Sequence, residues 1–241
     1  MRSGRVILAI YFFNIMALTD NLQAFYKLSD LSDSSGNNRT LTNNGNVSFA
    51  PGKIGNAAVF DETNSLDIPE NLLAGKTQAS VSLWVKTTDN DGYLVSAGGL
   101  EGITVVNQGG VFTFNTVSGY TPIQTSQIIN DGEWHHCVAT FLNGDVVLYI
   151  DGQQSSTGQT DSVIADSGKT KMTIGKQPDD DWASFVGQID AVGIWNRALN
   201  SAEVAELYNN GTGIELEGSA APTLVKMQAP VKFFGKVKFG V

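Results

Sequence analysis

The sequence predicts an all-β protein in which two antiparallel sheets pack face to face, with one short C-terminal helix and an arm at each end. Three observations support this fold class. Short runs of alternating apolar and polar residues recur along the chain. Clusters of glycine, asparagine and aspartate separate these runs, as expected for turns. Only residues 200–208 combine a helix-capping signal with a one-sided apolar stripe.

Length and charge narrow the classes of protein that fit. With 241 residues, the chain is long enough for one β-sandwich domain with a sizeable core and additional terminal segments. The formal net charge is −9 and only 16% of the residues are charged, which argues against nucleic acid as a partner. Cys137 is the single cysteine, so no intrachain disulfide can form. Its place in an alternating strand predicts a small, buried apolar side chain.

Residues 1–20 form an apolar N-terminal segment that starts with a basic run. Two interpretations stay open. The segment is either a secretory signal peptide, or else a retained apolar arm or an upstream extension of a chain whose true start is Met16. The apolar run is too short to cross a bilayer comfortably, so no membrane span is predicted.

The folded domain is expected over residues 21–213. The extended apolar stretch 21–28 predicts its first strand, and the polar run 29–37 predicts a loop. Further strands are expected where short alternating runs lie between turn residues, at Ser80–Thr87, Tyr93–Ala97, Ile103–Val106, Val111–Asn115, Lys171–Gly175 and Phe185–Trp195.

The stretch from Asp131 to Gly152 is the strongest local signal and predicts a β-hairpin. Its first strand, Trp134–Leu142, alternates, so that Cys137, Ala139 and Phe141 share one face. The turn at Asn143-Gly144-Asp145 provides residues that tolerate positive φ. The second strand, Val146–Ile150, is rich in β-branched and aromatic residues.

The predicted helix lies near the end of the domain. Asn200 can cap its N-terminus, and Glu203, three residues later, completes the capping-box spacing. Val204 and Leu207 form its apolar stripe, and Asn210-Gly211 ends it.

Residues 214–241 form a basic C-terminal arm, because residues 222–241 carry four lysines and no acidic residue. Apolar and basic residues alternate there, which is compatible with an edge strand protected by lysines. A solvated tail and an arm that docks on a neighbouring subunit both stay open, and the apolar content favours docking.

Several motifs in this order resemble the laminin-G-like, concanavalin A-like jelly-roll domains, over residues 21–213. The hairpin 134–152 is one of these motifs. The run Gly52-Lys53-Ile54-Gly55 with Phe60-Asp61 is another, although Glu62 stands where the family usually has glycine. The loop 33–37 and the closing stretch 190–208 complete the resemblance. It implies a two-sheet jelly-roll sandwich of the concanavalin A-like type.

The sequence argues against an enzyme. Glycosidases on related folds need two or three carboxylates at alternate positions of one strand, and no Glu-x-Asp-x-Glu run is present. His135 and His136 are consecutive, so their side chains leave opposite faces of a strand and cannot act on one centre. We interpret both histidines as structural.

Calcium is the one cofactor that the resemblance suggests. Domains of this superfamily often hold a structural Ca²⁺ between the N-terminal loop and the final strand, which here implies Asp190 with Asp33 and Asp61. The related pentraxins bind ligand through calcium on a loop that corresponds to the residues after Gly175. There, Asp179, Asp180, Asp181 and Trp182 are the candidate ligand-binding residues, and a solvated acidic turn is the alternative.

Carbohydrate binding would need aromatic platforms and amide groups on one sheet face. The candidate platforms, each of which could instead be a core residue, are Trp84, Tyr93, Tyr120, Trp182 and Trp195.

Two functional classes follow from these observations. The first is a non-enzymatic structural or adhesion protein displayed on a surface, above all a virion component such as a phage capsid decoration or appendage protein. Its sandwich would face outward to contact glycans or the host surface, and its arms would bind copies of itself or other subunits. The second is a secreted, calcium-dependent lectin-like module that binds carbohydrate or protein. The expected location is therefore extracellular or at the virion surface.

Overall fold

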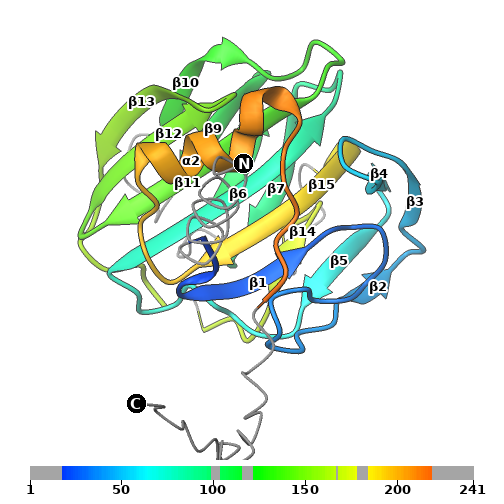
Figure 1. Cartoon of the computed structure of the whole chain (residues 1–241), viewed down its shortest axis with the longest axis horizontal. Helices are drawn as coiled ribbons and strands as arrows, with labels where there is room; N and C mark the ends of the chain where they lie inside the picture. Colours follow the sequence, from blue (N-terminus) through cyan, green and yellow to red (C-terminus); the bar gives the residue numbers. More distant parts are fainter. Residues whose placement is uncertain (1–17, 99–103, 116–121, 167, 178–183, 219–241) are drawn as a thin grey trace, which may run out of the picture.

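The computed structural model describes residues 18–98, 104–115, 122–166, 168–177 and 184–218, and these residues form two antiparallel sheets packed face to face (Figure 1). The predicted two-sheet sandwich is confirmed. Sheet A has the order β13-β12-β11-β6-β15-β4-β3, with β1 also beside β15. Sheet B has the order β10-β9-β8-β7-β14-β5-β2.

The strands of sheet A are β1 (Leu22–Tyr26), β3 (Ser48–Pro51), β4 (Asn56–Asp61), β6 (Gln78–Lys86), β11 (His135–Leu142), β12 (Asp145–Ile150), β13 (Gln153–Gln159) and β15 (Val186–Trp195). Those of sheet B are β2 (Thr42–Asn44), β5 (Ser65–Ile68), β7 (Asp91–Ser96), β8 (Thr104–Gln108), β9 (Val111–Asn115), β10 (Ile123–Ile128) and β14 (Met172–Ile174).

The predicted hairpin is formed by β11 and β12, which pair from Cys137↔Ile150 to Leu142↔Asp145. Asn143 (φ 50°) and Gly144 (φ 97°) make the two-residue turn, and both have the positive φ that such a turn requires. The hairpin lies inside sheet A, because β11 also pairs with β6 along its whole length.

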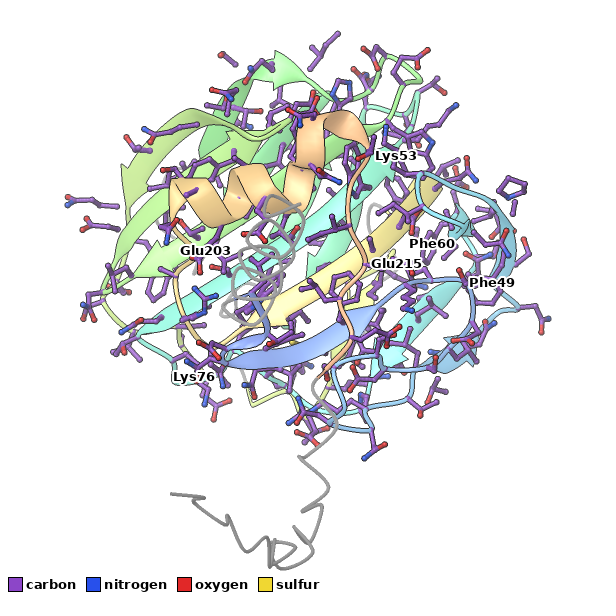
Figure 2. All side chains as sticks on the ribbon, in the orientation of Figure 1. Phe49, Lys53, Phe60, Lys76, Glu203 and Glu215 are labelled. Carbon is purple, nitrogen blue, oxygen red and sulfur yellow. The ribbon has the colours of Figure 1, made fainter. Side chains whose placement is uncertain are left out.

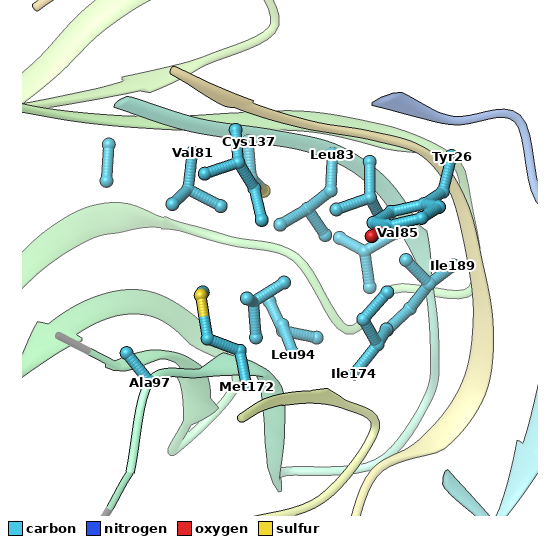
Figure 3. Close-up of a cluster of buried hydrophobic side chains, with 14 of the residues drawn as sticks. Tyr26, Val81, Leu83, Val85, Leu94, Ala97, Cys137, Met172, Ile174 and Ile189 are labelled. Carbon is cyan, nitrogen blue, oxygen red and sulfur yellow. The ribbon is translucent and has the colours of Figure 1, made fainter. Parts of the chain in front are cut away.

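The main core lies between the sheets. Figure 3 shows Leu83, Val85 and Cys137 of sheet A facing Leu94 and Met172 on the sheet B side. All of these side chains are buried. Each large apolar side chain buried in this way stabilises the fold by about 1.5–3 kcal/mol. Cys137 is therefore a core residue, as its strand position predicted.

A second apolar cluster covers the outer face of sheet A. Helix α2 (Ser201–Tyr208) contributes Val204 and Leu207 to it, and it lies across the strands of that sheet (Figure 1). Leu18 and Leu216, both fully buried, belong to the same cluster. The folded unit therefore reaches a few residues beyond 21–213 at each end.

The ends of α2 follow the sequence signals. Asn200 Oδ1 accepts hydrogen bonds from the backbone N–H of Ala202 (2.9 Å) and Glu203 (3.1 Å). The Glu203 carboxylate accepts in return from the backbone N–H of Asn200 (2.8 Å), which completes the capping box. Glu203 lies at the start of the helix in Figure 2.

The helix ends at Asn209, which adopts the left-handed conformation, and the 3₁₀ turn η2 (Asn209–Gly211) follows. No helix among the described residues is both long and apolar enough to span a membrane.

Candidate functional site

The two outer faces of the sandwich differ in what lies on them. The outer face of sheet A is sealed by α2 and by the segments around Leu18 and Leu216. In the part of the chain that the structure describes, the two apolar clusters account for the interior and for this face, and neither lies on the outer face of sheet B. The outer face of sheet B is therefore the one to examine for a ligand.

A hollow of about 110 Å³ lies on sheet B where β7, β8 and β9 run side by side. Strand register brings its side chains together: Asp91 pairs with Gln108, and Tyr93 pairs with Val106. Paired residues of antiparallel strands share a face, so these four side chains project from the same side of the sheet. The hollow is lined by Asp91, Gly92, Tyr93, Val106, Asn107, Gln108 and Asn115.

Hydrogen bonds hold the rim of the hollow in place. The backbone N–H of Gly109 donates to Asp91 Oδ1 (3.1 Å), which joins the start of β7 to the end of β8. Asn107 Nδ2 donates to the carbonyl of Asp89 (2.8 Å). Asn107 Oδ1 is buried and has no hydrogen-bond partner within the described structure.

The chemistry of the hollow suits a polar, uncharged ligand. Gln108 and Asn115 provide amide donors and acceptors, and Asp91 provides a carboxylate acceptor. Tyr93, which is partly exposed, provides apolar surface between these groups, and Val106, paired with it, is buried. A ring with one apolar face and several hydroxyl groups matches this combination.

The candidate platforms fall into three groups. Tyr93 lines the hollow and is partly exposed. Trp84 and Trp195 are only 2% and 0% exposed and belong to the cluster on sheet A, so as platforms these two candidates are wrong. Tyr120 and Trp182 lie outside the described residues, as do Asp179, Asp180 and Asp181.

The structure does not gather the three predicted calcium ligands into one set. No group of three His, Cys, Asp or Glu side chains suited to a metal occurs among the described residues. Asp33 is used locally, because its carboxylate accepts from the backbone N–H of Phe25 (3.1 Å), Ser35 (2.9 Å) and Arg39 (3.0 Å).

Asp61 is also used locally and is exposed, with Oδ1 accepting from the backbone and hydroxyl of Thr63 (3.1 and 2.7 Å). The described residues therefore contain no cluster of three acidic side chains built from Asp33, Asp61 and Asp190. Calcium binding, with backbone carbonyls among the ligands, stays a prediction.

Asp190 differs from the other two because it is fully buried in β15. It lies where β15 changes neighbours: Ile189 pairs with β4, whereas Val192 pairs with β1. Its Oδ2 accepts from the backbone N–H of Ile54 (2.8 Å), but its Oδ1 has no partner within the described structure. Burial raises the pKa of Asp190 to about 7, against the opposing effect of the backbone donors around it.

The loop that meets Asp190 fits closely. A Cβ atom on Gly52 would lie 2.7 Å from Asp190 Oδ2, so glycine is required for this approach. Lys53 in the same loop places its Nζ 4.5 Å from the centre of the Trp84 ring. Lys53 and Glu215, which lies on the segment that follows η2, are labelled in Figure 2.

The two histidines have structural contacts. His136 is buried, its Nε2 lies 2.9 Å from Ser82 Oγ, and burial lowers its pKa to about 3, so it stays neutral. His135 Nδ1 lies 2.9 Å from Asp151 Oδ2, and this hydrogen bond raises the pKa of His135. Burial raises the pKa of the Cys137 thiol, which makes it a poor nucleophile.

Sequence reasoning singled out Tyr93 but not Asp91, Gln108 or Asn115. A usable signal was present, because carboxamide and carboxylate residues stand at the ends of three consecutive short strands. The missing information was the register, which decides that Asp91 and Tyr93 lie opposite Gln108 and Val106.

Similarity to known proteins agrees with the fold. A family model described as the concanavalin A-like lectin/glucanases superfamily matches residues 60–205, more than half of the chain. Human neuronal pentraxin-1 is 33% identical over 97 residues, which cover 35% of this chain and 22% of that protein. A rat protein with sushi, von Willebrand factor type A, EGF and pentraxin domains is 31% identical over 103 residues, 39% of this chain. The match covers only 3% of the rat protein.

Solved structures show the same architecture. Domain 4 of AbnA, a GH43 extracellular arabinanase from Geobacillus stearothermophilus solved in complex with arabinotriose, has a TM-score of 0.67 and 29% identity. That match covers 77% of this chain and 97% of the domain. The binding domain of botulinum neurotoxin DC, in complex with SialylT, has a TM-score of 0.61. Its sequence is 17% identical to this chain, and the match covers 80% of this chain and 52% of the toxin chain. This similarity shows the fold alone. The chain belongs to the concanavalin A-like lectin/glucanases superfamily.

Proposed function

We propose that this chain is a non-catalytic, extracellular binding module that holds carbohydrate on the outer face of sheet B. The observation that carries the proposal is the hollow between β7, β8 and β9, where Tyr93 lies among amide and carboxylate groups. A sugar ring would place its apolar face on Tyr93 and its hydroxyl groups against Gln108, Asn115 and Asp91.

The similarity to the arabinanase domain supports a carbohydrate ligand. That domain is related to this chain over nearly its whole length, and it was solved in complex with arabinotriose. An arabinose-containing oligosaccharide is therefore the first ligand to test. Because neuronal pentraxin-1 and a zebrafish adhesion G-protein coupled receptor (23% identical over 77% of this chain) are among the relatives, a protein ligand is the alternative.

The lining of the hollow supports binding without hydrolysis. Glycosidases place two carboxyl groups about 5–10 Å apart on either side of the bond that is cleaved. Among the described residues that line the hollow, Asp91 is the single acid. A bound sugar would therefore contact one carboxylate, which can accept a hydrogen bond. The pair of carboxyl groups that hydrolysis requires would be incomplete in this lining.

The test is retention on immobilised oligosaccharides, with arabinotriose among them. Tyr93→Ala should weaken binding about tenfold or more, because it removes the stacking surface, worth about 1.4 kcal/mol. Leu142→Ala is the matched control, since Leu142 is an exposed apolar residue (42%) at the end of β11 in sheet A. Equal retention of both variants and the wild type would place the ligand elsewhere.

Display on a virion or another surface assembly is a further proposal. It depends on the segments 1–17 and 219–241, which lie outside the described residues. Their apolar and basic composition supports binding to copies of the chain or to other subunits. Native mass spectrometry of the full chain tests it, and a monomer at micromolar concentration would contradict self-assembly.

A further inference from the structure

We infer that the hollow on sheet B selects a single neutral sugar residue and that Asp91 is the residue that rejects acidic sugars. This inference rests on the proposed function, because it names the class of carbohydrate that the same hollow accepts. The sugar residue in the hollow would be a terminal or branching residue of a glycan. The hollow should bind a neutral sugar more tightly than the corresponding uronic acid.

The position of the Asp91 carboxylate is fixed. Its Oδ1 accepts the hydrogen bond from Gly109 N–H (3.1 Å), and the pairing Asp91↔Gln108 places it opposite an amide of the lining. Tyr93 lies two residues further along the same strand and on the same face. A sugar ring resting on Tyr93 is therefore within reach of the carboxylate.

The charge that the described residues place in the hollow opposes an anionic ligand. The described residues that line the hollow include one carboxylate and no lysine, arginine or histidine. Lys171, beside β14 of the same sheet, is already paired with Asp67 (2.7 Å). The whole chain carries a formal net charge of −9. A uronate or sialate would meet repulsion from Asp91 without a compensating cation.

The size of the hollow limits how much of a glycan it can surround. Pockets that enclose a drug-sized ligand have volumes of about 300–1,000 Å³. The hollow of about 110 Å³ is smaller and surrounds one sugar residue at most. The remainder of an oligosaccharide would extend along the sheet or into solvent, so the charge of the residue in the hollow dominates recognition.

The experiment uses immobilised sugar pairs that differ only in charge: glucose with glucuronic acid, and galactose with galacturonic acid, beside the arabinotriose already proposed. The wild type should bind the neutral member of a pair about tenfold more tightly at low salt. Asp91→Asn keeps an oxygen that can accept from Gly109 N–H but removes the charge, and it should narrow this ratio about three- to tenfold. Glu206→Gln on α2 is the charge-matched control and should leave the ratio unchanged.

The ratio compares the binding of two sugars by the same protein sample. Partial unfolding of a variant lowers both values equally and leaves the ratio unchanged. A second readout needs no variant: raising the salt from 0.02 to about 0.5 M should narrow the wild-type ratio, since screening weakens the repulsion. Equal wild-type binding of both members of each pair, or an unchanged ratio in Asp91→Asn, would overturn the inference and leave carbohydrate binding standing. No binding to any sugar, arabinotriose included, would overturn the proposed function and this inference with it.

Discussion

Glu62 occupies a backbone conformation that a glutamate rarely adopts. Its φ is +70°, and it follows β4 at the point where related domains usually have glycine. Most of the other non-glycine residues at positive φ are asparagine or aspartate, which tolerate this region. The tight turn expected from the motif is thus kept despite the substitution, at a cost in backbone strain.

Replacing this residue should stabilise the protein. Glu62→Gly should raise the free energy of unfolding by about 1 kcal/mol, because the relief of left-handed strain exceeds the added entropy of the unfolded glycine. Urea unfolding measures the change. Glu133→Gly is the control, since Glu133 is also exposed but is not among the residues at positive φ, and it should lower stability. A loss of stability in Glu62→Gly would contradict the account of strain.

At the scale of elements, apolar alternation identified most of the strands that have a buried face, but it missed β4 and β5, which also have one, and β13, which has little. β6, β7, β9, β11, β12, β14 and β15 lie where they were predicted, and their buried residues explain why. β13 has the sequence QQSSTGQ, with no apolar residue to mark it. It is placed by pairing with β12 and by contact with β10, where a Cβ on Gly158 would lie 2.5 Å from Ile123. The candidate site could not be predicted for a similar reason. Its residues come together only through the register of β7, β8 and β9, which the apolar pattern does not specify.

Asp190 links the centre of sheet A to the loop at residues 52–55, and its ionisation should affect stability. The folded pKa of about 7 lies above the unfolded value of about 3.9, so the folded state binds the proton more tightly. This contribution is complete below pH 4 and is lost as the pH rises to 7 and above. It amounts to at most about 4 kcal/mol, at 1.36 kcal/mol per pKa unit.

Asp190→Asn should remove this pH dependence, because the neutral amide can still accept from Ile54 N–H. We expect the variant to be about as stable as the wild type at pH 4 or below and more stable at pH 8. Thermal melts of both proteins at both pH values, with and without EDTA, measure the difference in stability. If Asp190 instead holds calcium with backbone carbonyls, chelator should lower the melting temperature of the wild type and Asp190→Asn should be less stable at pH 8.

At the scale of the whole molecule, the segment after α2 completes the cover of sheet A. It runs back over β15 and β1 (Figure 1). Leu216 is fully buried there, and Lys27 pairs with Glu215 (3.3 Å) and with Glu217. Gly218 N–H donates to the carbonyl of Ser34 (2.6 Å), which fixes the end of the segment.

A chain that ends at Gly213 should be less stable than one that ends at Gly218. The loss of Leu216 alone should cost about 2–3 kcal/mol, which corresponds to a fall of about 4–12 °C in melting temperature for a domain of this size. Differential scanning calorimetry measures it. Glu217→Gln in the longer chain is the control and should change little, because the Glu217 side chain is 70% exposed. Equal melting temperatures of the two chains would show that the segment contributes nothing.

The outer face of sheet A is covered by an apolar cluster, whereas neither apolar cluster lies on the outer face of sheet B. The two faces should therefore differ in how well they tolerate substitutions. On β7 and β9, the inward residues Leu94, Phe112 and Phe114 belong to the core, whereas alternate positions such as 91 and 93 do not. Substitutions at those alternate positions that are exposed or partly exposed should therefore redirect recognition without endangering folding, whereas the equivalent positions of sheet A should tolerate few exchanges. A randomised library confined to Asp91, Tyr93, Gln108 and Asn115, which are exposed or partly exposed, should consequently contain mostly folded members with altered preferences.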